Sequence, residues 1–241
     1  ERFAVTPGAT LQVDLVEVGP NSRMEPAGLP VGPDRLSYSG FRLGGEGSEI
    51  RHVETKNGGV RFSVQMPRPG LAAVVVGLKP VVVEMGPETL ETTLRKLHLS
   101  ERAKNELTAK IGQRSCKVSR RFHAKVFVRA GLPVEADRDW QEVVGGEFEL
   151  IPGLSPIDLQ VGKAFVVRPL YRGTAVANLA VNFRTFDGVH EHVAYTDSNG
   201  QAEAILDVAG KWLIFGTIIQ PAEGAGGLDL AMEVATLAVE V

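Results

Sequence analysis

The sequence predicts a mainly β protein with two sandwich-like domains, the first of which carries a two-helix insertion. Three observations predict this fold class. Most strand-like segments alternate apolar and polar residues, one internal stretch changes to a helical period, and turn residues divide the second half into about seven short runs. With 241 residues, of which 44% are apolar and 23% charged, the chain is long enough to bury a substantial core.

Strand signals dominate the start of the chain. Apolar and polar side chains alternate at residues 10–17 and again at residues 60–66, as expected for strands with one buried face. Asn57 and Gly58 separate the second of these runs from residues 50–55, and both residue types tolerate the positive φ of a tight turn. We therefore predict a β-hairpin at this point.

The hydrophobic period changes to that of a helix after Gly86. Pro87 suits the first position of a helix, because a proline there loses no helical hydrogen bond. Leucines then recur at helical spacing, namely Leu90, Leu94 and Leu97. A second helix is predicted from Ser100, whose side chain can cap the N-terminus, to Gly112, which can end it. The two helices near residues 87–112 form the predicted insertion.

Residues 131–146 show no period and end in the pair Gly145-Gly146, which is typical of a linker. We therefore predict an N-terminal β-rich domain of residues 1–146 and a C-terminal domain of residues 147–241. The second domain is predicted to be an immunoglobulin-like β-sandwich, because turn signals separate strand-like runs at residues 147–151, 163–171, 175–184, 191–195, 202–207, 211–219 and 232–241.

Positive charge is concentrated in residues 95–129. This segment holds eleven of the 26 Lys and Arg residues and two of the 29 acids, so its net charge is +9, whereas the rest of the chain carries −12. One interpretation is a surface for an anionic partner, and the other is that these cations neutralise acidic neighbours in the same molecule. Aromatic residues do not interleave with the cations, and the whole chain carries only −3, so no nucleic-acid partner is expected.

Several functional classes have no support in the sequence. The single cysteine, Cys116, can form no internal disulfide and cannot by itself supply a thiolate zinc site. The apolar run at residues 71–78 is far shorter than the ~20 residues of a membrane-spanning helix, so no transmembrane segment is predicted. Neither a Gly-x-Ser-x-Gly elbow nor a P-loop occurs, and we predict that the protein is not an enzyme.

His190 and His192 form the densest cluster of metal-ligating side chains. In a strand, residues i and i+2 point to the same face, so both imidazoles can reach one Ni²⁺, Co²⁺ or Zn²⁺ ion. Glu191 points the other way, which leaves Asp187 or a loop residue such as Asp229 to supply a third ligand. The alternative is that the two histidines are simply exposed side chains of a strand that follows a turn, without a role in metal binding. The remaining histidines stand alone and are expected to be surface or partly buried residues (His52, His98 and His123).

Two elements of the second half carry a resemblance to a known sandwich. Thr196 to Gly200 reads Thr-Asp-Ser-Asn-Gly, and a Gly-Lys-Trp element follows from Gly210 to Trp212. This order resembles the transthyretin-like or carboxypeptidase-regulatory-like β-sandwich, in which a T-D-x-x-G hairpin precedes a G-x-W strand. The physical basis is that Asp197 and Gly200 form the turn and that Trp212 fills the inside of the sandwich.

Short motifs across nearly the whole chain resemble the DUF4198 family. They lie before the first strand, before an apolar strand and at the start of the first predicted helix (Arg2-Phe3-Ala4-Val5-Thr6-Pro7-Gly8, Pro69-Gly70-Leu71 and Glu84-Met85-Gly86-Pro87-Glu88). Members of this family are described as possible periplasmic components of nickel or cobalt uptake. The resemblance therefore implies a periplasmic, non-enzymatic binding or accessory protein that handles a nickel or cobalt ion. It also implies a membrane component of a transport system as the partner.

The resemblance further implies that a secretory signal and a metal-binding N-terminus preceded Glu1. Family members typically carry a His-Asp-Phe-Trp-like stretch after the signal peptide, and the sequence begins just past that point. The family's histidine after the G-x-W element and its Trp-rich acidic stretch have no counterpart here, although Asp229 matches the acidic position. His190 and His192 are therefore the candidate metal ligands in this sequence.

A second function class stays open beside metal handling. The edges of a β-sandwich, or the basic segment at residues 95–129, could engage an envelope protein or an anionic glycan. Carbohydrate binding through a sandwich face is less favoured, because the chain has only two Trp and three Tyr to stack on sugar rings. The sequence contains no feature that indicates an oligomeric state.

Overall fold

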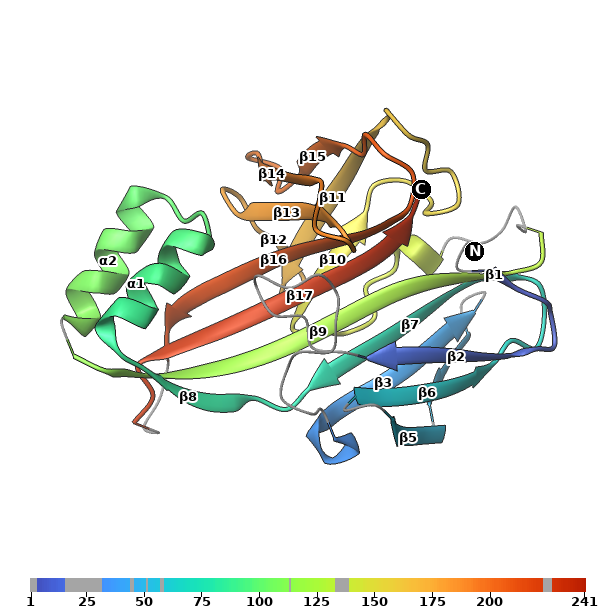
Figure 1. Ribbon diagram of the computed structural model, residues 1–241, viewed down its shortest axis with the longest axis horizontal. Helices are drawn as coiled ribbons and strands as arrows, with labels where there is room; N and C mark the ends of the chain where they lie inside the picture. The colour runs from blue at the N-terminus through green and yellow to red at the C-terminus, as the bar shows by residue number, and fades with distance from the viewer. Residues whose placement is uncertain are drawn as a thin grey trace.

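The structure is a computed structural model that describes residues 4–15, 32–43, 46–50, 52–56, 59–112, 114–132, 139–222 and 227–241. In these residues the chain forms three β-sheets and two α-helices, with two short 3₁₀ turns at η1 (Pro33–Arg35) and η2 (Asp139–Gln141) (Figure 1). The prediction of a mainly β protein with a two-helix insertion is confirmed.

Among the described residues, the largest sheet has ten strands. Its long strands run along most of the length of the molecule (Figure 1). Eight of the ten strands lie in the spatial order β14 (Glu191–Tyr195), β13 (Ala180–Thr185), β16 (Lys211–Pro221), β17 (Leu230–Glu240), β9 (Cys116–Ala130), β7 (Gly70–Leu78), β3 (Leu36–Leu43) and β4 (Glu46–Glu49). The other two, β1 (Ala4–Val5) and β8 (Val81–Met85), pair with β9. Residues 118–126 of β9 pair with β17 and also, in part, with β8 and β7, while residues 129–130 pair with both β1 and β7. Because a residue can pair with only one strand on each side, β17 and β1 lie along one edge of β9, and β8 and β7 lie along the other.

This central sheet joins the two halves of the chain. Residues 230–238 of β17 pair in parallel with residues 118–126 of β9. Within the described part of the C-terminal half, the strands pair with one another in antiparallel fashion. The predicted boundary near residue 146 therefore lies between strands of one shared sheet, and the division into domains of residues 1–146 and 147–241 stays a prediction.

Two smaller sheets pack against the central one. The first contains β10 (Phe148–Pro152), β11 (Ala164–Tyr171), β12 (Thr174–Ala175) and β15 (Ala202–Ile205). The second contains β2 (Thr10–Leu15), β6 (Gly59–Gln65) and β5 (His52–Lys56). Antiparallel pairing of β5 with β6 confirms the predicted hairpin, whereas its turn at Asn57 and Gly58 lies outside the described residues.

Every residue of β7 is buried, because the strand is covered on both faces. Leu71 and Ala73 belong to the core shared with the sheet of β10 and β11. Ala72 and Val74, which point to the opposite face, belong to the core shared with the sheet of β2, β5 and β6. A strand buried on both faces reads as a continuous apolar run, which explains the pattern at residues 71–78.

The helices α1 (Pro87–Lys96) and α2 (Glu101–Ile111) lie between β8 and β9 and cover one end of the central sheet (Figure 1). The Ser100 hydroxyl accepts a hydrogen bond from the Ala103 amide at 3.3 Å, and Gly112 ends α2 with a positive φ of 67°. Both features match the prediction. The buried helical side chains pack on the start of β9 and of β17 (Leu90, Leu94, Leu107 and Ile111 on Cys116, Val118, Leu230 and Met232).

We predict that Gly77→Ala destabilises the protein. Gly77 lies directly across from Tyr38, and a methyl group at this position would come within 2.0 Å of the Tyr38 ring. The ring cannot easily move, because the Tyr38 hydroxyl is hydrogen-bonded to His123. We expect the free energy of unfolding to fall by about 1–3 kcal/mol in urea denaturation. Gly47→Ala is the control, because the nearest atom to a methyl group there, among the described residues, is 3.6 Å away. An equal loss in both variants would contradict the prediction.

Candidate metal-binding site

The turn between β13 and β14 fixes the start of the histidine strand. The Asp187 carboxylate accepts hydrogen bonds from the Thr185 hydroxyl at 2.5 Å and from the Val189 amide at 3.0 Å. The Thr185 bond first, and the Val189 amide second, lower the pKa of Asp187. Gly188 has a positive φ of 71°, which glycine adopts without strain. The turn thus places His190 immediately before β14.

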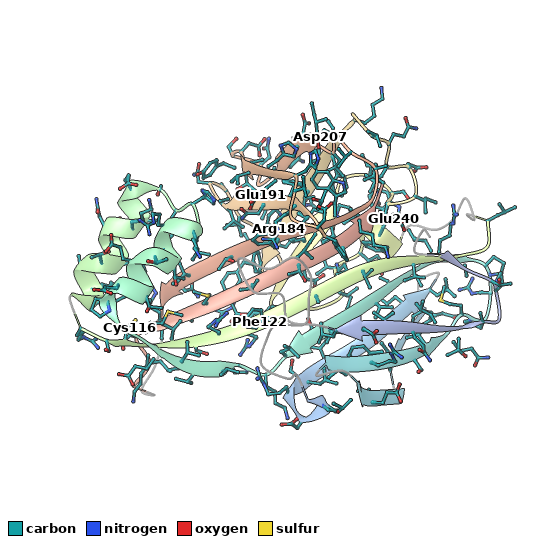
Figure 2. The ribbon with its side chains drawn as sticks, in the orientation of Figure 1. Cys116, Phe122, Arg184, Glu191, Asp207 and Glu240 are labelled. Atoms are coloured by element: carbon teal, nitrogen blue, oxygen red, sulfur yellow. The ribbon has the colours of Figure 1, made fainter. Side chains whose placement is uncertain are left out.

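His190 and His192 point to the same side and face one carboxylate. His190 Nδ1 lies 3.4 Å from Asp207 Oδ2, and His192 Nε2 lies 3.2 Å from Asp207 Oδ1. Figure 2 labels Asp207 and, on β14, Glu191 in the same upper part of the view. The histidine side chains are 37% and 39% exposed, so solvent reaches both imidazoles. The prediction that residues i and i+2 bring both imidazoles together agrees with this geometry.

Asp207 supplies the negative charge of this cluster. Its pKa is lowered, first by the hydrogen bond from His192 and, to a smaller extent, by the one from His190. The carboxylate is therefore ionised at neutral pH and can only accept hydrogen bonds. Asp207 comes from the connection between β15 and β16, and sequence reasoning did not select it.

Trp212 lies beneath the cluster and supports it. Its ring stacks on the His192 ring with centroids 5.9 Å apart and planes 15° apart. The indole Nε1 donates a hydrogen bond to the Val208 carbonyl at 3.1 Å, one residue after Asp207. Trp212 itself is fully buried in the core between the sheets, which confirms that it fills the inside of the sandwich. Trp212 of β16 therefore positions both the His192 ring and the loop that carries Asp207.

The two predicted acidic ligands have other contacts. Asp187 hydrogen-bonds within its own turn, although it lies near enough to His190 for that ring to affect its pKa. Asp229 forms an ion pair with Arg114 and accepts a hydrogen bond from the Lys117 amide at 2.8 Å. It precedes β17 at the end of the sheet covered by the helices, so the structure does not bring it to the histidines.

Within the described residues, no three or more His, Cys, Asp or Glu side chains are grouped so that they could hold a metal ion. Cys116 is buried, and burial raises the pKa of its thiol. No helix in the described part of the chain is long and apolar enough to span a membrane.

A second polar cluster, which sequence reasoning missed, lies on β9 where the central sheet faces the sheet of β10 and β11, and its central side chains are buried. His123 is 5% exposed, its Nδ1 lies 3.1 Å from the Tyr38 hydroxyl, and its Nε2 lies 3.0 Å from Glu233. Burial first, and the charge of Glu149 second, raise the pKa of Tyr38 to about 12. We call this group the β9 polar cluster, which comprises Tyr38, Arg121, His123, Lys125, Glu147, Glu149 and Glu233.

Lys125 and Glu149 form the most buried ion pair of the β9 polar cluster. Lys125 Nζ donates to Glu149 Oε2 at 2.9 Å, and the Val144 and Gly146 amides donate to the same carboxylate at 3.1 and 2.6 Å. Burial lowers the pKa of Lys125, and the charge of Glu149 opposes that shift. The end of the predicted linker is therefore fastened to the central sheet.

Many cations of the basic segment at residues 95–129 form ion pairs with acidic side chains of the same chain. This arrangement supports the interpretation that they neutralise acidic neighbours, while a surface for an anionic partner stays a prediction. The ion pairs within the described residues include Arg102–Glu106, Lys104–Glu101, Arg114–Asp229, Arg121–Glu147 and Lys125–Glu149.

Comparison with known protein families gives a match to one of them. The model of the family described as "Domain of unknown function (DUF4198)" matches residues 1–216, which is most of the chain. The chain belongs to the DUF4198 family. In this DUF4198 protein the matched region contains His190, His192 and Asp207, and it ends within β16. A search of curated proteins found no match.

Proposed function

We propose that this DUF4198 protein is a non-enzymatic binding protein that captures a divalent transition-metal ion, nickel or cobalt, through His190 and His192. The observation that carries the proposal is that both imidazoles reach the same ionised carboxylate, at 3.4 and 3.2 Å. Imidazole nitrogen is a suitable ligand for nickel, cobalt and zinc. A carboxylate that accepts a hydrogen bond from a ligating histidine is a recurrent support of such ions.

The exposure of the pair suits an ion that is carried rather than retained. Two imidazoles leave several coordination positions of a bound ion to water or to groups of a partner protein. An ion held in this way can be exchanged readily, which is what delivery to a transport system requires. The proposed location is the periplasm and the proposed recipient is a membrane component of a nickel or cobalt transporter. The family resemblance, rather than the fold, supports these two points.

Trp212 provides a spectroscopic test of the proposal. The chain has two tryptophans, so Trp140→Phe leaves Trp212 as the only one. Because the His192 ring stacks on Trp212, paramagnetic Ni²⁺ or Co²⁺ at His192 is expected to quench Trp212 fluorescence along a saturable curve. Mg²⁺, which prefers oxygen ligands, is expected to leave the emission unchanged.

His98→Asn is the matched control for substitutions at the pair. His98 is an exposed histidine with a φ of 50°, a conformation that asparagine tolerates. Its backbone carbonyl, which accepts a hydrogen bond from the Tyr195 hydroxyl, is kept in the variant. Quenching should persist in this variant and disappear in His190→Ala. Identical quenching curves for the parent protein and His190→Ala would contradict capture of the ion by the pair.

A further inference from the structure

We infer that Asp207 is a positioning residue that selects a different tautomer for each histidine, so that His190 offers Nε2 and His192 offers Nδ1 to an incoming ion. The tautomer selection stands on the geometry of the metal-free protein. The statement about the ion rests on the proposed function.

The two histidines use opposite ring nitrogens toward Asp207. His190 presents Nδ1 to Oδ2, whereas His192 presents Nε2 to Oδ1. An ionised carboxylate only accepts hydrogen bonds, so the nitrogen that faces it must carry the proton. A neutral imidazole has a single N–H, and its other nitrogen keeps a free lone pair. The lone pairs therefore lie on Nε2 of His190 and on Nδ1 of His192.

The backbone on both sides of Asp207 is anchored. The Leu206 carbonyl accepts a hydrogen bond from the Gly162 amide at 2.8 Å, and the Leu206 side chain is buried. On the other side, the Val208 carbonyl accepts the Trp212 indole N–H at 3.1 Å. The carboxylate is thus held in position before any ion arrives, which is the requirement for a group that orients ligands.

The His192 ring is also held, because it stacks on the buried Trp212 ring. His190 lacks such a stacking partner among the described ring pairs. Asp207 is therefore expected to matter most for the orientation of the His190 ring. Free histidine prefers the Nε2–H form, so His192 keeps its preferred tautomer while Asp207 holds His190 in the less favoured Nδ1–H form.

Nitrogen-15 NMR of the histidine-labelled, metal-free protein tests the tautomers directly. At about pH 8, where ordinary imidazoles are neutral, two-bond proton–nitrogen correlations should show Nδ1–H for His190 and Nε2–H for His192. In Asp207→Ala, His190 should change to the Nε2–H form while His192 does not change. Glu203→Gln, which alters an exposed carboxylate on β15, should leave both tautomers unchanged. Asp207→Glu should restore the Nδ1–H form of His190 at least in part.

Diamagnetic Zn²⁺ then tests the ligand atoms. Its addition should shift the resonances of His190 Nε2 and His192 Nδ1, and Asp207→Ala should weaken the apparent affinity by about 10–100-fold. An Nε2–H tautomer of His190 in the unmodified protein, or an unaltered His190 tautomer in Asp207→Ala, would overturn the positioning role. The predicted tautomers without any Zn²⁺-induced shift would overturn the proposed metal capture and leave the positioning role standing.

Discussion

Replacing Glu149 with alanine is expected to lower the free energy of unfolding by about 3–5 kcal/mol. Glu149 is 4% exposed and its carboxylate is the partner of the equally buried Lys125 ammonium, at 2.9 Å. Removing the carboxylate leaves a buried positive charge without compensation, and it also leaves the Val144 and Gly146 amides without their acceptor. Urea denaturation followed by circular dichroism measures the loss.

Two further variants serve as a control and as a rescue for Glu149→Ala. Glu106→Ala removes the partner of Arg102 from an exposed ion pair on α2, and it should change stability far less because solvent screens both groups. Replacing the buried pair together, as Lys125→Met with Glu149→Leu, should recover most of the stability lost in Glu149→Ala, because no unpaired charge remains. A loss in Glu149→Ala no larger than that in Glu106→Ala would show that the pair is not buried as described.

Trp212→Ala is expected to have an effect of similar size, a loss of about 3–5 kcal/mol. Trp212 is fully buried, packs in the core between the central sheet and the sheet of β10 and β11, and donates to the Val208 carbonyl. The substitution leaves a large cavity and removes the support of both His192 and the Asp207 loop. Thermal unfolding monitored by circular dichroism measures the loss.

Trp212→Phe is the variant to compare with Trp212→Ala. It retains an aromatic ring beneath His192 but loses the indole N–H and part of the volume, so its loss of stability should be clearly smaller than that of Trp212→Ala. Equal stability of Trp212→Ala and the unmodified protein would contradict the position of this side chain inside the sandwich.

The local elements of this fold could be predicted from sequence, because their signals are local. The alternation at residues 60–66 marks one buried face of β6, and Ser100 and Gly112 mark the ends of α2. Which strands become neighbours was not predictable in the same way, since alternation indicates which side chains share a face and not which strand pairs alongside. The parallel pairing of β9 with β17 joins residues more than a hundred positions apart, across a segment whose composition is typical of a linker.

The candidate site was predictable to the same extent. The spacing of His190 and His192 is sufficient to place both imidazoles on one face of a strand. Asp207 lies next to the two histidines only because β14 and β15, the strand that precedes Asp207, belong to different sheets that pack together. The spacing of residues along the sequence does not indicate that packing. His123 was expected to stand alone, yet it lies between Tyr38 and Glu233, which are 85 and 110 positions away in the chain.

Isothermal titration calorimetry with Ni²⁺ and Co²⁺ at neutral pH is the most direct test of metal capture. Titrations should compare the unmodified protein, His190→Ala with His192→Ala, and the control His98→Asn. We predict saturable binding in the unmodified protein and in the control, and its loss in the double variant. Absence of binding in the unmodified protein, or undiminished binding in the double variant, would contradict metal capture by His190 and His192.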